Sequence, residues 1–350
     1  MESPEHPLAA QRLQNLPKVE LHRHLEGSLR ISTLRQIARQ HNLPFPADTD
    51  LPALVQIQAG EPLTFANFLS KVQPLRQFYQ SPQIITRVVE EVIADAAAEQ
   101  VRHLELRFTP AALARAQGFP LNEVMDWVIE SACRAASQRG LSLALIASFN
   151  RHEPLELARQ VTALSADRAG SGIDGLDLAG NEAEFSALPF AGLLREAKQS
   201  GLHLTIHAGE WGGAANVREA IQDLHTDRIG HGVRVLEDPS IAALARERQI
   251  PFEVCVTSNV QSGVCPSVLA HPVRGMLAAG LNATLNTDDP SISNIDLTHE
   301  YRLAVQELQL TLAQLKDRIL AAARASFLPP AEKQTLCNSL ELELAQQITT

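Results

Sequence analysis

Short apolar runs recur along the chain, and longer segments with apolar residues at three- and four-residue intervals separate them. This alternation predicts parallel strands joined by helices, as in an α/β protein. The runs are almost continuously apolar, which is typical of strands that are covered on both faces. The eight runs are residues 19–25, 101–108, 141–149, 175–179, 202–207, 228–232, 252–256 and 283–286.

Eight strands are the number that a closed (β/α)8 barrel requires, so we expect an α/β fold of the TIM type. Residues 34–80 are too many for one crossover and are expected to form extra helices over the C-terminal mouth of the barrel. The glycine-rich residues 168–175 are expected to form a loop before a strand rather than a linker between domains. The other expected helices are 87–99, 121–139, 193–200, 214–224, 240–247, 297–310, 312–325 and a last one near 339–347.

The length and composition are compatible with this architecture. A chain of 350 residues fits one barrel with insertions, although length alone would also permit two domains. We expect a single domain over residues 1–350. The longest apolar stretch, 141–149, is too short to span a bilayer. Residues 1–6 lack the basic and apolar regions of a secretory signal, so we expect an untargeted start.

The charge and the cysteines limit the possible partners. The formal net charge is -10 at pH 7 and no basic cluster compensates it, which disfavours nucleic acid and anionic membranes. Cys133, Cys255, Cys265 and Cys337 are scattered without a CxxC pair, which argues against a disulfide framework and against a thiolate zinc site. We therefore expect a cytoplasmic protein that acts on a small molecule, without nucleic acid, membrane or an obligatory protein partner.

The first run ends in two histidines that could bind one cation. His22 and His24 are two residues apart, so in a strand their side chains point to the same face. Reactive groups of a parallel barrel lie at the C-terminal ends of its strands, which is where these histidines stand. An HxH pattern alone is weak evidence, because two ordinary strand-end histidines would give it as well.

Other polar residues stand at the ends of the fifth, sixth and eighth runs. Taken singly, His207 could be a buried core histidine, His231 a turn residue, and the pair Asp288 and Asp289 a helix cap. Glu210 follows His207 by three residues across a tight Ala-Gly turn, as an acid beside a ligand would. The coincidence at four strand ends favours a site, and imidazoles with one carboxylate are a donor set suited to zinc.

Six segments closely resemble the adenosine deaminase family, in the same order, over about residues 16–328. They are LPKVELHRHLEGS at 16–28, DLAG at 177–180, HAGE at 207–210, RIGHG at 228–232, TSN at 257–259 and NTDDP at 286–290. The resemblance implies a (β/α)8 barrel with one Zn²⁺ per chain. It implies as metal ligands His22, His24, His207 and Asp288.

The resemblance also implies a reaction, the hydrolytic deamination of adenosine or 2′-deoxyadenosine to the inosine product and ammonia. His231 would orient or deprotonate the attacking water, and Glu210 would protonate a ring nitrogen of the purine. Asp289 would accept a hydrogen bond from the purine, and the backbone N–H of Gly180 would donate one. The implied substrate-binding residues are His24, Glu26, Phe65, Phe68, Leu69, Gly180 and Asp289.

The segment that resembles the family's apolar gate has a second interpretation. Phe65, Phe68, Leu69 and Val72 follow an i, i+3, i+4, i+7 spacing and would form one apolar helix face. Spacing alone would also be satisfied by a face buried in the core.

The sequence departs from the family pattern at two positions. Glu26 stands where many adenosine deaminases have an aspartate that contacts the ribose 5′-hydroxyl, and Trp211 is larger than the expected residue. An alternative substrate is therefore a 5′-modified adenosine, such as aminodeoxyfutalosine. Two further alternatives are a non-catalytic barrel that binds purines and a metal-dependent amidase or phosphoesterase, which would need a bridging lysine or a second metal set.

Overall fold

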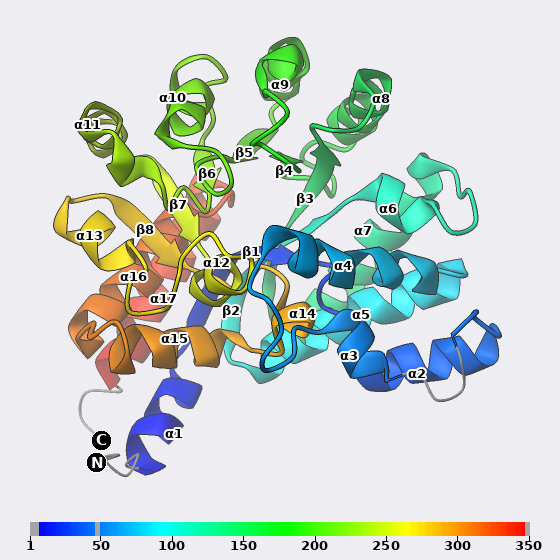
Figure 1. Cartoon of the computed structure of the whole chain (residues 1–350), viewed down its shortest axis with the longest axis horizontal. Helices are drawn as coiled ribbons and strands as arrows, with labels where there is room; N and C mark the ends of the chain where they lie inside the picture. The colour runs from blue at the N-terminus through cyan, green and yellow to red at the C-terminus, as the bar shows by residue number, and fades with distance from the viewer. Residues whose placement is uncertain (1–6, 46–49, 347–350) are drawn as a thin grey trace.

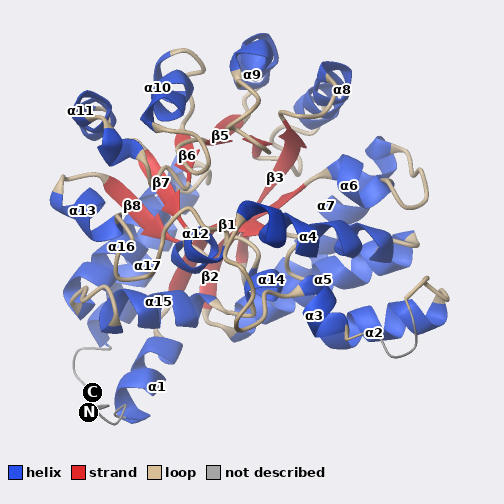
Figure 2. Ribbon diagram, in the orientation of Figure 1, coloured by secondary structure: helices blue, strands red, loops and turns tan. Residues whose placement is uncertain are grey.

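The computed structural model describes residues 7–45 and 50–346, and its strands form the predicted barrel. All eight strands are parallel and pair in sequence order, from β1 to β8. Figure 2 shows the strands at the centre of the molecule with the helices around them. The strands are β1 (Lys18–His24), β2 (Val101–Phe108), β3 (Ser142–Asn150), β4 (Gly175–Ala179), β5 (His203–His207), β6 (Arg228–Gly230), β7 (Pro251–Val254) and β8 (Asn282–Leu285).

The barrel closes between β1 and the residues that follow β8. The backbone N–H of His24 donates to the carbonyl of Asp288 (2.8 Å), and the N–H of Asp288 donates to the carbonyl of His22 (2.9 Å). Arg23 and Asp288 form the corresponding parallel bridge. Residues far apart in the sequence therefore meet at the seam of the barrel.

Two of the strand ends predicted from the sequence are wrong by two residues. The sixth strand ends at Gly230 because His231 (φ 58°) and Gly232 (φ 66°) adopt left-handed backbone conformations that a strand cannot continue. The seventh ends at Val254, and Val256 begins helix α12 (Val256–Gln261). The carboxylate of buried Glu300 accepts the N–H groups of Val256 (2.9 Å) and Thr257 (3.2 Å), which turns the chain into that helix.

The predicted helices are present, with shifted ends. The last helix begins earlier than predicted, because Pro330 is compatible with a first helical position and the first turns bury Leu336 and Cys337. The end of that prediction, Gln347, lies outside the described residues, as do residues 1–6 and their expected untargeted start. These helices are α5 (Pro82–Ala98), α7 (Leu121–Arg139), α9 (Ala191–Gln199), α10 (Ala214–Gln222), α11 (Pro239–Glu247), α15 (Leu297–Gln306), α16 (Leu312–Ala325) and α17 (Pro330–Gln346).

Further helices were not predicted from the sequence. Four of them have four to six residues, which is too short to show a helical period. Residues 168–174 form the predicted loop, with one isolated bridge between Ala169 and Ile173, and Gly175 begins β4. Within the described ranges, none of the helices combines the length and the apolar character needed to cross a membrane. The additional helices are α1 (Pro7–Asn15), α6 (Pro110–Ala114), α8 (Leu155–Ala166), α12, α13 (Val273–Ala278) and α14 (Pro290–Ser293).

The extra helices between β1 and β2 lie at the barrel mouth, as expected. They are α2 (Ile31–Gln40), α3 (Leu51–Val55) and α4 (Phe65–Leu75), followed by the 3-10 turn η1 (Arg76–Phe78). In Figure 1, α4 passes across the front of the barrel. The Thr64 hydroxyl caps α4 by accepting the N–H of Asn67 (3.3 Å). Pro74 stands in its last turn, and the chain tightens into η1 there.

A network of buried ion pairs fills the barrel interior. Glu253 accepts from Arg107 Nη2 (2.7 Å) and from Arg228 Nε (2.6 Å), and Arg107 Nη1 lies 3.3 Å from Asp177 Oδ2. These four side chains are at most 1% exposed. Removing one partner would leave an uncompensated charge in the core, which costs much more than losing a surface pair.

We therefore expect Arg228→Met to lower the free energy of unfolding by about 3–5 kcal/mol. The matched control is Arg134→Met, because Arg134 pairs with Glu90 (2.7 Å) and both side chains are more than 40% exposed. That control should cost less than about 1 kcal/mol. Urea unfolding of both variants measures the difference. Equal losses would contradict the structural importance of the buried network.

Candidate active site

The four predicted metal ligands converge at the C-terminal mouth of the barrel. One ligand atom from each side chain lies within 4.8 Å of all the others. Asp288 Oδ1 is 3.2 Å from His22 Nε2 and 3.3 Å from His24 Nε2. The rings of His22 and His207 have their centroids 4.8 Å apart. These residues are His22, His24, His207 and Asp288.

Local backbone structure explains this convergence. His22 and His24 alternate with Arg23 along β1 and therefore share one face. Asp288 has a left-handed backbone (φ 70°), and its backbone groups are bonded to β1. This geometry brings its carboxylate beside the two histidines at the seam of the barrel.

Buried carboxylates orient two of the histidine rings. Glu253 Oε2 contacts His22 Nδ1 (2.8 Å), and Asp177 Oδ1 contacts His207 Nδ1 (2.9 Å). Burial opposes ionisation of both acids, but Arg107 and Arg228 hold the pKa of Glu253 well below its usual range. His207 and Arg107 similarly lower the pKa of Asp177 against the effect of burial. An ionised carboxylate accepts a hydrogen bond from Nδ1–H, so each ring presents its Nε2 lone pair to the cluster.

The donor set fits a metal ion. His22 Nε2 is buried and has no hydrogen-bond partner in the described part of the chain, although a buried polar atom normally has one. Asp288 Oδ2 accepts the hydroxyl of Ser258 (2.7 Å), so its Oδ1 remains directed at the histidines. Three imidazole nitrogens and one carboxylate oxygen are ligands that zinc takes in catalytic sites, with a further position for water.

A second possible donor group overlaps the first. His231 and Cys255 could join His22 and Asp288 around a cation. Burial and the carboxylate of Asp288 raise the pKa of the Cys255 thiol well above its usual value, and its sulfur donates to the carbonyl of Glu253 (3.5 Å). Cys255 is therefore a protonated thiol, whereas the metal ligand is a thiolate. The set that contains His207 is the better metal site.

The predicted acid, Glu210, is buried beside the predicted metal ligands. Burial raises its pKa well above the usual value, and the carboxylates of Asp288, Glu182 and Asp289 raise it further. This shift favours the protonated carboxyl group, which is the form that a general acid needs.

His231 lies between Glu210 and the metal ligands. Its Nε2 is 3.6 Å from Glu210 Oε2 and 3.9 Å from Asp288 Oδ2. Burial lowers the pKa of His231 well below its usual value, so the ring is neutral. The side-chain amide of Asn259 donates to its Nδ1 (3.1 Å), which leaves the ring proton on Nε2. His231 can therefore orient a water by donating to it.

Asp289 and two glycines shape the part of the site where the sequence predicts the purine to bind. Burial, and then the charges of Asp288 and Glu26, raise the pKa of Asp289 well above its usual value. A protonated Asp289 would donate a hydrogen bond to a ring nitrogen of the purine. The role predicted from the sequence, in which Asp289 accepts a hydrogen bond from the purine, would require its ionised form. A Cβ on Gly27 would stand 1.8 Å from Asp289 Oδ1, and a Cβ on Gly180 (φ 91°) would stand 2.8 Å from His152 Nδ1. Neither glycine can be replaced without displacing the wall of the site.

These groups share one cavity of about 520 Å³. The apolar face of α4 lines it, so this face is not simply buried core: Phe68 is buried, but Leu69 is 41% exposed. The ring of Phe65 lies 4.2 Å from that of Trp211, centroid to centroid, across the mouth. The predicted residues that line the cavity are His24, Glu26, Phe65, Phe68, Leu69, Val72, Gly180, His207, Glu210, Trp211, His231, Asp288 and Asp289.

Several residues at the site were not predicted from the sequence. Glu182 follows β4, and its carboxylate accepts the N–H groups of Gly209 (2.9 Å) and Glu210 (2.5 Å), which fixes the turn that carries the acid. Arg76 lines the cavity from η1. The DLAG segment did contain a signal for Asp177, but Glu182, Arg76 and Glu253 stand in no recognisable motif.

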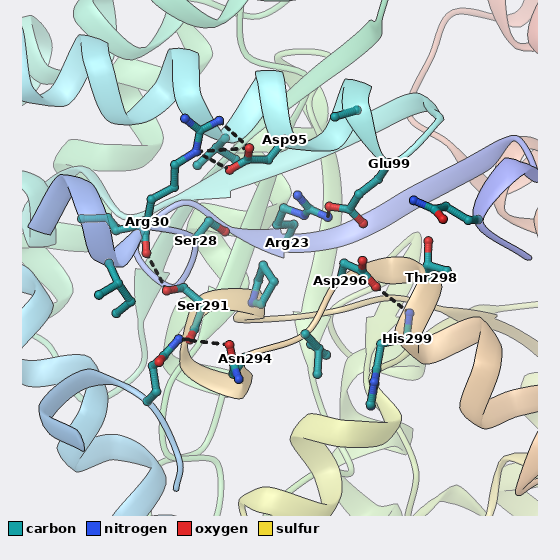
Figure 3. A pocket seen from close by; sticks show the side chains of 18 of the residues that line it. Arg23, Ser28, Arg30, Asp95, Glu99, Ser291, Asn294, Asp296, Thr298 and His299 are labelled. Carbon is teal, nitrogen blue, oxygen red and sulfur yellow. Dashed lines mark hydrogen bonds and ion pairs between the residues drawn. The ribbon is translucent and has the colours of Figure 1, made fainter. Parts of the chain in front are cut away.

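A larger cavity of about 900 Å³ lies outside the barrel, between α5, α14 and α15. Figure 3 shows that its charged side chains point toward one another. Arg30 is paired with Asp95, and Arg23 Nη2 contacts Glu99 Oε1 (3.1 Å). In the described ranges, no group of possible metal ligands lies in this cavity. The cavity at the mouth is therefore the candidate active site.

Sequence comparisons match known proteins over most of the chain. The sequence model of the adenosine deaminase family matches residues 17–342. The adenosine deaminase of Escherichia coli O7:K1 is 34% identical over 325 residues, which cover 92% of this chain and 96% of that protein.

Solved structures show the same architecture. The adenine deaminase of Arthrobacter aurescens superposes with a TM-score of 0.87 at 27% identity, over 96% of this chain and 100% of that one. An amidohydrolase of Burkholderia ambifaria with bound zinc superposes with a TM-score of 0.90 at 25% identity, over 100% of this chain and 95% of that one.

Proposed function

This chain belongs to the adenosine deaminase family, and we propose that it converts adenosine or 2′-deoxyadenosine and water to inosine or 2′-deoxyinosine and ammonia. One observation carries the proposal: the buried carboxyl group of Glu210, whose pKa is raised by burial and by neighbouring carboxylates, stands in the same cavity as a donor set of three histidines and one aspartate. Hydrolytic deamination of a purine needs both an acid for the ring nitrogen and an activated water.

We propose that one zinc ion per chain is held by the three histidines and Asp288. When bound, zinc lowers the pKa of a coordinated water to about 7 and so supplies hydroxide at neutral pH. The support is the unpartnered Nε2 of His22 and the two carboxylates that hold the rings of His22 and His207. Such outer carboxylates orient histidine ligands and raise their basicity.

Three side chains then act on the purine or on the attacking water. Glu210 gives its proton to a ring nitrogen of the purine, which makes the neighbouring amino-bearing carbon more electrophilic. The Nε2–H of His231 orients the attacking water, and Asp289 hydrogen-bonds the ring. The apolar face of α4 excludes bulk water from the cavity, which strengthens the electrostatic interactions inside it.

The alternatives have less support. A non-catalytic purine-binding barrel would not need a buried acid with a raised pKa beside a complete metal donor set. An amidase or phosphoesterase of this superfamily would use a bridging lysine, and none of the described lysines lines the cavity. A 5′-modified adenosine is an alternative substrate, because Glu26 and Trp211, which depart from the family pattern, both line the cavity.

We further propose that the whole chain is one catalytic domain that acts in the cytoplasm without nucleic acid, membrane or an obligatory protein partner. The formal net charge of -10 supports this, since it would repel anionic surfaces.

Ultraviolet-monitored deamination with adenosine, 2′-deoxyadenosine and free adenine tests the proposal. We expect both nucleosides to be converted, and adenine to have a kcat/KM at least about tenfold lower, because it lacks the remote binding energy of the ribose. Protein treated with a chelator and protein reloaded with zinc are the matched controls. Absence of turnover with the zinc-loaded protein and both nucleosides would refute the assignment.

A further inference from the structure

Beyond the groups assigned to the deamination, one end of the cavity carries unsatisfied polar atoms. Arg76 lines the cavity with its Nε buried and without a hydrogen-bond partner. The Oε2 atom of Glu26 and the hydroxyl of Tyr79 are also buried and unpartnered. The three side chains lie close enough that the charge of Arg76 influences the pKa of both Glu26 and Tyr79. Such a cluster of unmet hydrogen bonds is unusual in a folded protein.

Arg76 differs from the other arginines in the interior. Arg107 and Arg228 each contact a buried carboxylate. Within the described ranges, the Nε of Arg76 has no hydrogen-bond partner, and its guanidinium forms no ion pair with Glu26 or another carboxylate. Instead, Glu26 Oε1 accepts the N–H of Thr109 (2.7 Å). A partly buried guanidinium without a partner is costly, so it is suited to pair with a group that the ligand brings.

The position of Arg76 indicates which part of the ligand it meets. Glu210 and His231 stand at the strand ends on the cavity floor, whereas Arg76 comes from η1, directly after the helix that lines the mouth. With the purine at Glu210, Arg76 and Glu26 lie toward the sugar. This step rests on the proposed function, because that function places the purine.

We infer that the preferred substrate is an adenosine that carries an anionic group beyond its 5′ carbon, and that Arg76 is the specificity-determining residue that binds this anion. A carboxylate and a phosphate share this chemistry, since a guanidinium binds the oxygens of either in a bidentate manner. The surroundings favour a single negative charge. Arg76 is the one arginine or lysine among the described residues that line the cavity, so a single cationic side chain is available to pair with the anion.

Substrate selectivity tests the inference. We compare kcat/KM for adenosine, adenosine 5′-carboxylate, its neutral 5′-carboxamide and adenosine 5′-monophosphate. The carboxylate and carboxamide have nearly the same shape, so their ratio isolates the charge. We expect the wild-type protein to prefer the carboxylate over the carboxamide by about tenfold or more, the usual scale of a hydrogen bond to a charged group. The monophosphate arm distinguishes a phosphate site from a carboxylate site.

Three variants assign the selectivity to Arg76. Arg76→Gln should bring the carboxylate-to-carboxamide ratio close to one, and Arg76→Lys should restore part of it, because lysine keeps the charge without the bidentate fork. Arg134→Gln makes the same charge change at an exposed position outside the cavity and should keep the wild-type ratio. The dissociation constant of inosine 5′-carboxylate provides a readout without turnover, and it should rise in Arg76→Gln.

The outcomes separate this inference from the proposed function. If adenosine is deaminated but the wild-type protein does not prefer either anion over the carboxamide, the inference is wrong and the deaminase assignment stands. The same holds if Arg76→Gln keeps the wild-type ratio. If no adenosine compound is deaminated by the zinc-loaded protein, both fail. Should Arg76→Gln not fold, the wild-type ratio of carboxylate to carboxamide decides.

Discussion

His207→Ala is expected to remove both the bound metal and the deaminase activity. His207 is the ligand from β5, and its Nδ1 is held by Asp177, so its Nε2 is directed at the cluster before a metal arrives. Alanine leaves two histidines and one aspartate as ligands, and it removes the imidazole partner of Asp177 Oδ1. A loss of several kcal/mol of metal-dependent stabilisation corresponds to about a thousandfold or more in turnover.

Elemental analysis and turnover of the same preparations measure this effect. The wild-type protein purified without added metal should contain about one zinc per chain, and His207→Ala should contain much less. His203→Ala is the matched control, because His203 is at the other end of β5, where its ring stacks on Phe327 (4.6 Å) rather than facing the cluster. Full turnover of metal-free wild-type protein would refute a metal-dependent mechanism.

The strands could be predicted from the sequence because strands covered on both faces leave a local signal. The run at 101–108 coincides with β2, and that at 175–179 coincides with β4. The signal fails where a long-range contact ends the strand. Val256 continues an apolar run, but its N–H is bonded to Glu300, 44 residues away, and it begins a helix. Apolar periodicity carries no information about such a contact.

In the candidate site too, local relations between residues could be predicted from the sequence, and long-range contacts could not. The pair His22 and His24 could be recognised because two residues on one strand face share a direction. The carboxylate that orients His22 could not, since Glu253 is 231 residues away and meets it across the barrel. Arg76 stands in no motif. What distinguishes it is a buried Nε without a hydrogen-bond partner, and only a three-dimensional structure can show this.

The protonation state of Asp289 illustrates a further limit. Two adjacent aspartates are equivalent in sequence, yet the histidines and burial separate them in the structure. Although burial opposes ionisation of Asp288, its pKa is held well below the usual value, chiefly by His22. Burial and the charge of Asp288 raise the pKa of Asp289 well above its usual value. One member of the pair is therefore suited to a cation and the other to a ring nitrogen.

Glu210→Gln is expected to separate the acid chemistry from metal binding. Glutamine has nearly the same shape and can occupy the same buried position, but its amide has no acidic proton to give to the purine ring. General acid catalysis contributes about 10²–10⁴-fold, so turnover should fall by that factor. Glu210 is not one of the four converging ligands, so the variant should keep its metal.

Zinc content and kcat of Glu210→Gln, measured on one preparation, decide between the two roles of this residue. The matched control is Glu196→Gln, which makes the same change at an exposed position on α9. The control should retain both zinc and turnover. Because the raised pKa of Glu210 keeps it protonated before substrate arrives, the glutamine should also leave the affinity for the product inosine within a few-fold of the wild type. Loss of zinc from Glu210→Gln would instead make Glu210 part of the metal site. The acid would then have to be sought at Asp289, a partly buried carboxyl group in the cavity whose pKa is also strongly raised.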